Sequence, residues 1–374
     1  MTTHDVIIIG LGAMGSAAAC ELARRGQRVI GLDRFDEGHD RGSSHGASRI
    51  IRLGYFEHPS YVPLLHRAYE RWRELEAKSG RKLLQITGII ETGLPESNLV
   101  KGTLTASRLH NLDHDVLDAK EVMRRFPAYK LTSDYVGVWQ PQGGFLQADA
   151  AVSTHLMLAQ SAGADIRRGE TVTAIEPHGS GVRVITDRGS IEASVAIVCA
   201  GAWAKKLLPH LAAPLRPTRQ VFAWFEPRDK ALFAPERFPV FIMESAHGNH
   251  YGFPIDQWGV KVGKHHHFDE TVDPDTYDRT VSRADEEAIR AMLAEHMPQA
   301  NGAVVTAKTC LYTMMPDSDF VIDHAASNII VASPCSGHGF KFAPVVGEIL
   351  ADLAIGGSSR HDISRFRLGR FGEK

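Results

Sequence analysis

The stretch Val6–Arg34, which reads VIIIGLGAMGSAAACELARRGQRVIGLDR, decides the fold. Its first residues, Val6–Ile9, form an uninterrupted apolar and β-branched run, which predicts a strand buried on both faces. Alanine and leucine recur over Met14–Arg25 in a pattern typical of a helix, and a second strand over Arg28–Leu32 ends in Asp33. The stretch therefore predicts a strand, a tight turn, a helix and a second strand in one unit.

The turn between strand and helix carries the spacing G-x-G-x-x-G, formed by Gly10, Gly12 and Gly15. In a dinucleotide-binding turn, these glycines permit the tight turn, the approach of the backbone to a pyrophosphate and the packing of helix on strand. The helix N-terminus supplies N–H groups and a positive dipole end for the phosphates. Asp33 stands where an acid accepts hydrogen bonds from an adenosine ribose. The complete unit favours dinucleotide binding over an ordinary glycine turn. Because Asp33 would repel the 2′-phosphate of NADP, FAD and NAD remain.

Length and composition narrow the remaining classes. A chain of 374 residues is long for one core, so we expect two domains. A net charge of −2 without long basic runs argues against nucleic acid or an anionic membrane as partner. No apolar stretch is long enough to span a membrane, and the start MTTHD runs directly into a strand, so we expect a cytoplasmic enzyme without a signal peptide. The four cysteines lack C-x-x-C spacing, which predicts neither a zinc site nor a disulfide framework.

A polar loop follows Asp33 and continues to Tyr55. It is too long to be a bare connector, and it concentrates positive donors in His45, Arg49 and Arg52, so a functional loop and a solvated surface loop are both open. The elements predicted after it are an amphipathic helix over Tyr61–Ser79, a strand over Lys82–Thr92 and a helix over Gly102–His110.

The middle of the chain favours FAD over NAD. Asp149 is a plausible N-cap for a helix, and Gly201 follows an apolar strand where it would let the backbone approach the cofactor. The elements predicted here are a helix over Ala150–Ala162, short antiparallel strands over Glu170–Ile175, Val182–Thr186 and Ile191–Ala193, and a parallel strand over Val195–Cys199. A three-stranded insertion of this kind is typical of flavoproteins of the glutathione-reductase superfamily and rare in nicotinamide dehydrogenases.

Short strands rich in aromatic residues fill Arg216–Tyr277 and predict an antiparallel sheet that suits a substrate-domain wall. On a strand, His265 and His267 would share one face, but no third ligand is assured, so no metal site is predicted. The last elements predicted are a helix over Asp285–Met297, strands over Val304–Thr313, Phe320–Asp323 and Ile329–Ser333, and a glycine turn that leads into a helix.

Several motifs together resemble the monomeric sarcosine oxidase and N-methyltryptophan oxidase family of amine-oxidising flavoenzymes, over nearly the whole chain. They are GLGAMG at Gly10–Gly15, SHGASRIIR at Ser44–Arg52, YGFP at Tyr251–Pro254, VKVGKH at Val260–His265, TCLYTMMPD at Thr309–Asp317 and SGHGFKF at Ser336–Phe342. The resemblance implies an α/β (α+β) fold in which a Rossmann-type FAD-binding domain of the glutathione-reductase superfamily carries an inserted mixed-sheet substrate domain. The implied boundaries are 1–83, 146–215 and 319–374 for the FAD-binding domain, and 84–145 and 216–318 for the substrate domain.

The same resemblance implies a function. It is the oxidation of a secondary amino acid, N-methylated or cyclic, to an imine and then to an aldehyde and an amine, while O2 is reduced to H2O2. The implied partners are a small-molecule secondary amino acid and O2, the implied cofactor is FAD held through a thioether from Cys310 to its 8α carbon, and the implied state is a monomer.

Carried onto this chain, the resemblance assigns individual roles. Lys261 matches the lysine near flavin N5 that assists oxygen activation, and Arg52 and Lys341 match the cations that grip the substrate carboxylate. The other implied residues of the flavin and substrate cavity are His45, Arg49, Tyr251, His265 and Tyr312. The implied cofactor-binding residues are Gly10, Gly12, Gly15, Asp33, Arg34, Ser43, Gly201, Cys310, Gly337, Gly339 and Phe340.

The chain departs from the family at two places, and some simpler interpretations stay open. Where the family commonly has His-His-Gly-Asp-Thr-Arg, this chain has Ser-His-Gly-Ala-Ser-Arg at 44–49, so an acid is lost, and Pro334-Cys335 is also unusual. Without the resemblance, Lys261 could lie on the solvent face of its strand, Cys310 could be a buried hydrophobe, and Lys341 a solvated lysine at a helix start. The alternative functions are a dehydrogenase that passes electrons to a carrier and a non-catalytic flavin-binding subunit.

Overall fold

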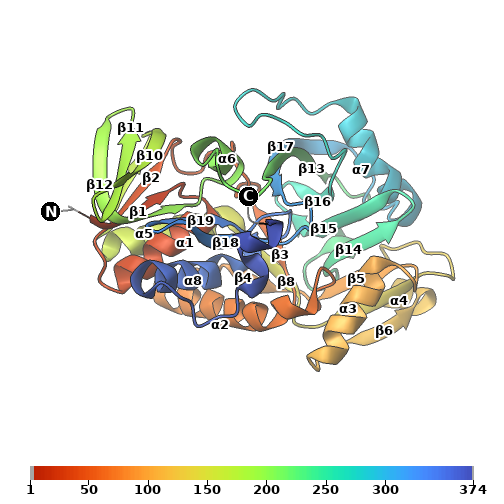
Figure 1. The fold of residues 1–374 in the computed structure, drawn as a ribbon. Coiled ribbons are helices and arrows are strands. Elements are labelled where there is room, and N and C mark those ends of the chain that lie inside the picture. The colour runs from red at the N-terminus through yellow and green to blue at the C-terminus, as the bar shows by residue number, and fades with distance from the viewer. Residues whose placement is uncertain (1–3, 373–374) are drawn as a thin grey trace.

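The computed structural model describes residues 4–372, which form two eight-stranded sheets and one three-stranded sheet (Figure 1). The first sheet contains the strand–turn–helix–strand unit predicted from the sequence. Its strands are β1 (His4–Ile9), β2 (Val29–Asp33), β9 (Asp165–Arg168), β10 (Val172–His178), β11 (Gly181–Thr186), β12 (Gly189–Val198), β18 (Val321–Ala326) and β19 (Ile329–Ser333). Because β1 pairs in parallel with both β2 and β12, it lies at the centre of this sheet, as its apolar sequence predicts.

The long strand β12 joins the antiparallel and the parallel parts of the first sheet. Its first half pairs antiparallel with β11, while its second half runs parallel to β19. The sequence predicts two strands here, Ile191–Ala193 and Val195–Cys199, and that prediction is wrong because β12 is one strand. The strand continues without a break, because Ala193 pairs with His4 of β1 on one side and with Val182 of β11 on the other.

Four helices pack beside the first sheet and against one another, below it in Figure 1. They are α1 (Ala13–Arg24), α2 (Val62–Ser79), α5 (Ala148–Ser161) and α8 (Ala343–Gly356). Helix α5 begins earlier than expected, with Gln147 at its N-cap, so the prediction of Asp149 as N-cap is wrong. Asp149 lies in the first helical turn, where its carboxylate accepts a hydrogen bond from the N–H of Ala47 at 2.8 Å. No helix within residues 4–372 is long and apolar enough to cross a membrane.

The second sheet forms the other half of the molecule, on the right of Figure 1. In spatial order its strands are β17 (Val304–Met314), β13 (Arg216–Phe225), β16 (Gly259–Lys264), β15 (Gly248–Asp256), β14 (Val240–Ser245), β5 (Ile89–Gly93), β7 (Val136–Gln140) and β6 (Asp115–Asp118). The aromatic-rich strands are antiparallel, as predicted. The sheet as a whole is mixed, because β5 joins β14 in parallel.

Side chains alternate between the two faces of this sheet. Val221 and Phe225 of β13 join the core on the face covered by α7 (Arg283–His296). Phe222 and Trp224 lie on the opposite face with Cys310. Lys261 is only 1% exposed, so the interpretation that it faces solvent is wrong.

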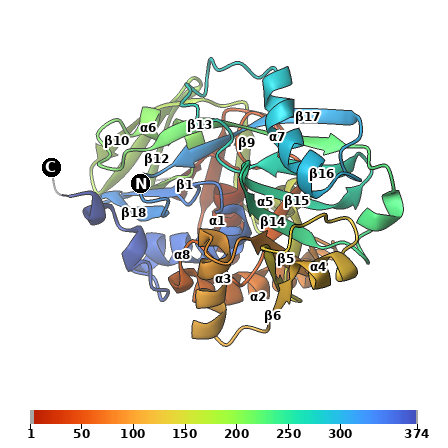
Figure 2. The ribbon, with the colours of Figure 1, turned by 90° about the vertical axis from the view of Figure 1, so that its right-hand side faces the viewer.

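Smaller elements complete the fold. They are the three-stranded sheet of β3 (Ser48–Ile51), β8 (Gly144–Gln147) and β4 (Leu84–Ile86), together with α3 (Asn98–Leu109), α4 (Ala119–Arg125) and α6 (Ala204–Leu207). Helices α3 and α4 pack on the β5, β7 and β6 end of the second sheet (Figure 2). The expected single strand Lys82–Thr92 is instead β4 and β5, separated at Gly88, whose φ of +74° breaks the extended backbone. Helix α3 starts before the expected Gly102 because Ser97 caps it.

Candidate active site

A cavity of about 820 Å³ extends from the glycine turn after β1 to the aromatic face of the second sheet. This volume lies within the range of small-molecule and cofactor sites. Every site residue predicted from the sequence lines the cavity, except Gly15 and Lys261. Residues that are more than 250 positions apart in the chain, such as Gly10 and Cys310, therefore meet around one space.

The glycine turn leaves room that side chains would fill. Gly10 has φ +89°, and a Cβ built there would lie 2.6 Å from the carbonyl oxygen of Cys199. A Cβ on Gly15 would lie 1.8 Å from the carbonyl oxygen of Gly10, so only glycine lets α1 pack this closely. Gly12 is the N-cap of α1 and leaves the helix N-terminus open to the cavity.

The end of β2 supports the same turn. The carboxylate of Asp33 accepts hydrogen bonds from the N–H of Leu11 at 2.7 Å and from the N–H of Phe35 at 2.9 Å. Each carboxylate oxygen keeps a further acceptor site, so Asp33 can still receive a ribose hydroxyl. Arg34 forms an ion pair with Asp275 at 2.5 Å beside the cavity. Gly201 also lines the cavity, with φ +51°.

Two serines of the loop after β2 line the cavity, and they make different contacts. Ser43 uses its hydroxyl to donate a hydrogen bond to the carbonyl of Leu311 at 2.5 Å. Ser44 Oγ instead accepts a hydrogen bond from the N–H of Ala13 at 3.0 Å. Ser44 was missed as a site residue, although it is the first residue of the SHGASR motif.

Four residues that line the cavity carry buried polar atoms without a hydrogen-bond partner in residues 4–372. These atoms are Nδ1 and Nε2 of His45, Oε1 of Gln220, Oδ1 of Asn249 and Oγ of Ser333. Buried polar atoms in proteins nearly always have a partner, so these atoms indicate a polar ligand. Together with the glycine turn, they fit FAD, which has polar groups along its whole length. Gln220, Asn249 and Ser333 were missed, because nothing in their local sequence marks them.

A second group of residues surrounds the cysteine expected to bind flavin. Cys310 is 3% exposed and lines the cavity, and burial raises the pKa of its thiol while the charges of Arg49 and Lys261 oppose that rise. Arg49 donates hydrogen bonds to the carbonyls of Ser43 and His45 at 2.8 and 2.6 Å. Burial, assisted by the charge of Arg49, lowers the pKa of His45 to about 3, so its ring is neutral.

Lys261 lies just behind the cavity wall. Its Nζ donates to the carbonyls of Gly46 and Ser48 at 2.5 and 2.9 Å, and it lies 4.7 Å from the centroids of the Phe222 and Phe253 rings. No carboxylate pairs with it among the ion pairs of residues 4–372, and burial holds its pKa well below the ordinary value of lysine.

Two tyrosines and a histidine form the wall opposite the glycine turn. The ring of His265 contacts Tyr312, with 3.4 Å between Nδ1 and the phenol oxygen. Burial raises the pKa of Tyr251 to about 12 and holds the pKa of His265 well below its ordinary value. At neutral pH all three side chains are therefore uncharged, and none is a strong base.

The three consecutive histidines do not share a strand as expected. β16 ends at Lys264, and His266 has φ +57° in the following turn. His267 turns away from the cavity and contacts Asp285, with 2.7 Å between Nε2 and Oδ1. Within residues 4–372, no group of three His, Cys, Asp or Glu side chains is arranged to hold a metal ion.

The glycine-rich turn before α8 is shaped by close contacts. Gly337 has φ +83°, and a Cβ there would lie 2.6 Å from the rings of both His265 and Tyr312. A Cβ on Gly339 would lie 1.6 Å from the carbonyl oxygen of Pro334. The next residue, Phe340, lines the cavity, so this turn brings the backbone close to the ligand space.

The guanidinium of Arg52 is 2% exposed and already has an acid partner. Its Nη2 donates to both carboxylate oxygens of Glu57 at 2.8 and 2.7 Å, and its Nη1 donates to the carbonyl of Gly54 at 2.7 Å. The rings of Tyr55 and Phe56 lie against it, with centroids 4.4 and 4.6 Å from Cζ. Glu57 was missed, because its role depends entirely on its distance to Arg52.

Lys341 lies beside Arg52 and is buried, not solvated. Its Nζ donates to the carbonyl of His338 at 2.6 Å and lies 3.4 Å from the hydroxyl of Tyr55. Burial and the charge of Arg52 lower its pKa to about 7. The amine therefore changes charge near neutral pH, and an anion in the cavity would favour the ammonium form.

Comparison with known proteins adds a family. Residues 5–353 match the family described as FAD dependent oxidoreductase. The chain is 44% identical over 374 residues to the monomeric sarcosine oxidase of Streptomyces avermitilis, and 97% of each chain is covered. It is 35% identical over 373 residues to the N-methyl-L-tryptophan oxidase of Salmonella dublin, covering 99% of this chain and 100% of that one. Its structure is similar to the open form of NikD, an unusual amino acid oxidase, with TM-score 0.86, 28% identity and 98% of each chain covered.

Proposed function

The chain belongs to the FAD dependent oxidoreductase family, and from this premise we propose that it is an oxidase of secondary amino acids. Its substrates are N-methyl or cyclic amino acids, its electron acceptor is O2, and its products are H2O2 and an imine that water hydrolyses to an aldehyde and an amine. The observation that carries the proposal is the pair of buried cations, Arg52 and Lys341, in the cavity that begins at the glycine turn. The similarity to a sarcosine oxidase and an N-methyltryptophan oxidase supports the same substrate class.

Different residues around the cavity would bind different parts of the cofactor. The chemistry that bound FAD supplies is acceptance of a hydride from the substrate carbon and return of its electrons to O2 as H2O2. The glycine turn and the N-terminus of α1 would hold the pyrophosphate, and Asp33 the adenosine ribose. The unpartnered atoms of His45, Gln220 and Ser333 would then find hydrogen-bond partners on the cofactor.

Substrate binding would begin at the two cations. Arg52 can hold a carboxylate bidentately, and Lys341 adds a point charge. At present Nη2 of Arg52 donates to both oxygens of Glu57. The substrate carboxylate therefore competes with Glu57 for the same face of the guanidinium. Glu57 itself lines the cavity.

The rest of the site suits loss of a hydride from a neutral amine. Tyr251, Tyr312 and His265 are uncharged and half-buried, so they line the site without offering a strong base. Holding the reacting carbon in place in such a site contributes to catalysis by orientation.

Two further roles complete the proposal. Cys310 would carry the covalent thioether to the flavin, supported by its position on the cavity wall and by its motif. Lys261 would assist the reaction with oxygen, supported by its burial and by the absence of a carboxylate partner in residues 4–372. The domain boundaries 1–83, 146–215 and 319–374 against 84–145 and 216–318 belong to the same proposal, and the β3–β8–β4 sheet crosses them. The monomeric state and the cytoplasmic location remain predictions.

A substrate panel tests the function. The purified enzyme is incubated with sarcosine, N-methyltryptophan, pipecolate and proline, and H2O2 is measured. We expect peroxide in stoichiometric amounts with at least one of them. Bleaching of the flavin by an amine without air, followed by little peroxide in air, would indicate the dehydrogenase alternative. No bleaching with any amine would favour the non-catalytic subunit.

Acid precipitation tests the covalent link. The yellow colour should stay in the pellet of the wild-type protein, and Cys310→Ala should release it into the supernatant. Cys335→Ala is the matched control, because Cys335 also lines the cavity but is not expected to bind flavin. Free flavin in the wild-type supernatant would refute the link.

A further inference from the structure

We propose that Glu91, a residue outside the cavity, is a positioning residue for Arg52 and takes up one proton from solvent when a carboxylate binds there. The inference rests on the proposed function, because it concerns the same carboxylate site. Arg52, Glu57, Glu91 and Lys341 are called the buried cluster below.

Glu91 lies beside Nε of Arg52, whereas Glu57 accepts hydrogen bonds from Nη2. It lies on β5 and is fully buried, with 0% exposure. Its Oε1 is 3.5 Å from Nε of Arg52 and accepts no hydrogen bond from residues 4–372. Its Oε2 accepts a hydrogen bond from the hydroxyl of Thr103 at 2.9 Å. Glu91 is therefore fixed at one oxygen and poorly satisfied at the other.

The charges of the buried cluster leave no place for a third acid. Two carboxylates, Glu57 and Glu91, already face the single guanidinium of Arg52. A substrate carboxylate would add a negative charge beside Arg52, where an unpaired buried charge is strongly unfavourable. The added charge is offset when Lys341 or one carboxylate of the cluster binds a proton, or when one carboxylate leaves. Binding of a proton to Glu91, as COO⁻ plus H⁺ giving COOH, restores the balance without moving Arg52.

The surroundings identify Glu91 as the acid that gains the proton. Glu57 lines the cavity and is held ionised by Arg52, with its pKa lowered to about 2. Burial raises the pKa of Glu91 to about 7 although Arg52 opposes the rise. A new carboxylate beside Arg52 would raise it further, as a like charge does.

The other elements packed against Glu91 bring few competing charges. Its register neighbours on β14 and β7 are Ile242 and Val138, which carry none, and α3 contributes the hydroxyl of Thr103. The charged groups that face it are Arg52 and Glu57, from one segment, and Lys341 from the turn before α8. Lys341 is the one competing proton acceptor, because its pKa also lies at about 7.

Infrared difference spectroscopy separates the two acceptors. Isotope-labelled acetate is added to the flavin-loaded enzyme at about pH 8, and the spectrum of the free enzyme is subtracted. Proton uptake by Glu91 should produce the carbonyl band of a buried carboxylic acid, whereas uptake by Lys341 produces no such band. Thr103→Val should shift the band, because it removes the hydrogen bond to Oε2 and leaves the volume of the side chain nearly unchanged. Glu91→Gln should abolish it.

Affinity gives a second measurement. At about pH 8, a group with a pKa of about 7 is protonated in roughly one molecule in ten, so Glu91→Gln should bind acetate roughly tenfold more tightly than the wild type. At about pH 6 the two proteins should bind acetate about equally. Glu244→Gln is the matched control, because Glu244 is a carboxylate of the adjacent strand that accepts a hydrogen bond from the N–H of Leu99. It should leave both the band and the affinity unchanged.

The outcomes distinguish this inference from the function on which it rests. Acetate that binds to the wild type but not to Arg52→Gln, without an acid band that depends on Glu91, overturns the role of Glu91 alone. Acetate that binds equally well to Arg52→Gln overturns the carboxylate site and with it the role of Glu91. An acid band that persists in Glu91→Gln assigns the proton to another carboxyl group and also overturns the inference.

Discussion

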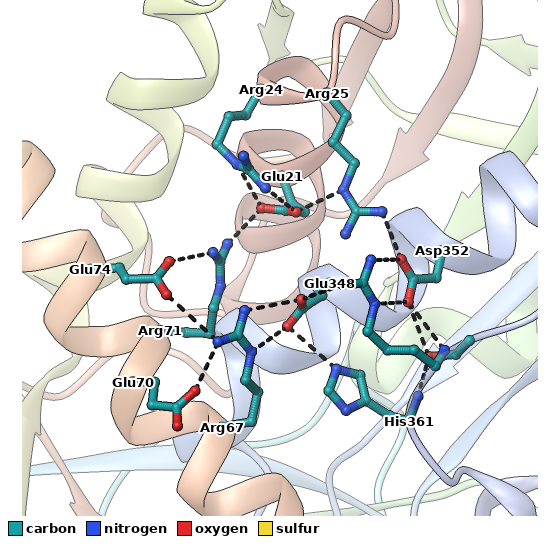
Figure 3. Close-up of polar contacts among 12 residues, drawn as sticks. Glu21, Arg24, Arg25, Arg67, Glu70, Arg71, Glu74, Glu348, Asp352 and His361 are labelled. Carbon is teal, nitrogen blue, oxygen red and sulfur yellow. Dashed lines mark hydrogen bonds and ion pairs between the residues drawn. The ribbon is translucent and has the colours of Figure 1, made fainter.

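Charged residues meet in two parts of this molecule, and their arrangements differ. One group joins α1, α2 and α8 and includes Glu21, Arg25, Arg71, Glu348 and Asp352 (Figure 3). The helix network is the following set of residues: Glu21, Arg24, Arg25, Arg67, Glu70, Arg71, Glu74, Glu348, Asp352, Arg360 and His361. The other group is the buried cluster around Arg52. The arginines of the helix network are partly exposed, whereas Arg52, Glu91 and Lys341 of the buried cluster are at most 5% exposed.

In the helix network each acid is surrounded by cations. Glu21 pairs with Arg24, Arg25 and Arg71, all within 2.7 Å. Glu348 accepts two hydrogen bonds from Arg67, at 2.9 and 3.1 Å. Each of these charges has an opposite charge in direct contact, although Nε of Arg71 has no hydrogen-bond partner in residues 4–372. The network stabilises the packing of α1, α2 and α8 against one another.

Around the cavity, the charges are incompletely paired. Lys261 has no acid partner in residues 4–372, Lys341 titrates near neutral pH, and Arg52 is shared by two acids. Unpaired or shared buried charges reduce stability and persist where they serve a function. The difference teaches that the state of pairing, and not the number of charges, separates a structural network from a binding site. Four substitutions test this contrast.

The largest effect is expected from Lys261→Met, which removes a buried cation that has no acid partner. Reoxidation of the reduced flavin by O2 should slow by roughly 10²–10³-fold, because a preorganised charge near developing negative charge contributes on this scale. Stopped-flow mixing with O2 measures it.

Because the pKa of Lys261 is lowered in the folded protein, its charge is present below that pKa and lost above it. The wild-type oxygen reaction should therefore slow as pH rises. Equal slowing of the anaerobic half-reaction would contradict the assignment.

The next effect is expected from Arg52→Gln, which removes the shared cation. A charge-assisted hydrogen bond contributes about 1.5–3 kcal/mol, so kcat/KM for an amino-acid substrate should fall roughly tenfold to a hundredfold. A decarboxylated amine should be a poor substrate of both proteins. Arg67→Gln in the helix network is the matched control and should leave KM unchanged. If the wild type oxidises the decarboxylated amine as well as its parent amino acid, the carboxylate site is wrong.

A smaller effect, on stability alone, is expected from Glu348→Gln in the helix network. It weakens the contacts to Arg67 and His361 and should reduce the free energy of unfolding by about 2 kcal/mol, measured in urea, with KM unchanged. Its arginine and histidine partners hold the pKa of Glu348 below its ordinary value. Its contribution to stability is therefore present above the unfolded pKa of about 4.5 and lost as pH falls toward the folded pKa. The difference between the two proteins should shrink in acid. A changed KM would refute the separation of the two groups.

The smallest effect is expected from Arg360→Ala. Arg360 belongs to the helix network but its side chain is 62% exposed, and it contacts Asp352 at 3.2 Å. Exposed ion pairs contribute about 0–1 kcal/mol, so the melting temperature should fall only slightly. The fall should be smaller at high salt, because salt screens the ion pair. A loss of stability as large as that caused by Glu348→Gln would contradict the expectation that exposed ion pairs contribute little.

The site illustrates how far local sequence reaches. The glycine turn, the acid after β2 and the alternation of Val260, Lys261 and Val262 were predicted, because each depends on neighbours within a few positions. The resemblance of motifs then indicated a further set of residues, nearly all of which line the cavity. Glu57 and Glu91 escaped prediction, because their meaning depends on their distance to one guanidinium.

The sequence by itself determined the order of the first strand, turn, helix and strand, and the antiparallel pairing of the aromatic-rich strands. Those features follow from hydrogen bonding and burial within neighbouring segments of the chain. Only the tertiary structure decided that Ser44, and not Ser43, meets the helix N-terminus, that β12 is one strand, and that Arg52 already holds an acid. Each of these features depends on contacts between segments that are distant in the chain. They are set by the packing of the whole molecule, which no local pattern of residues specifies.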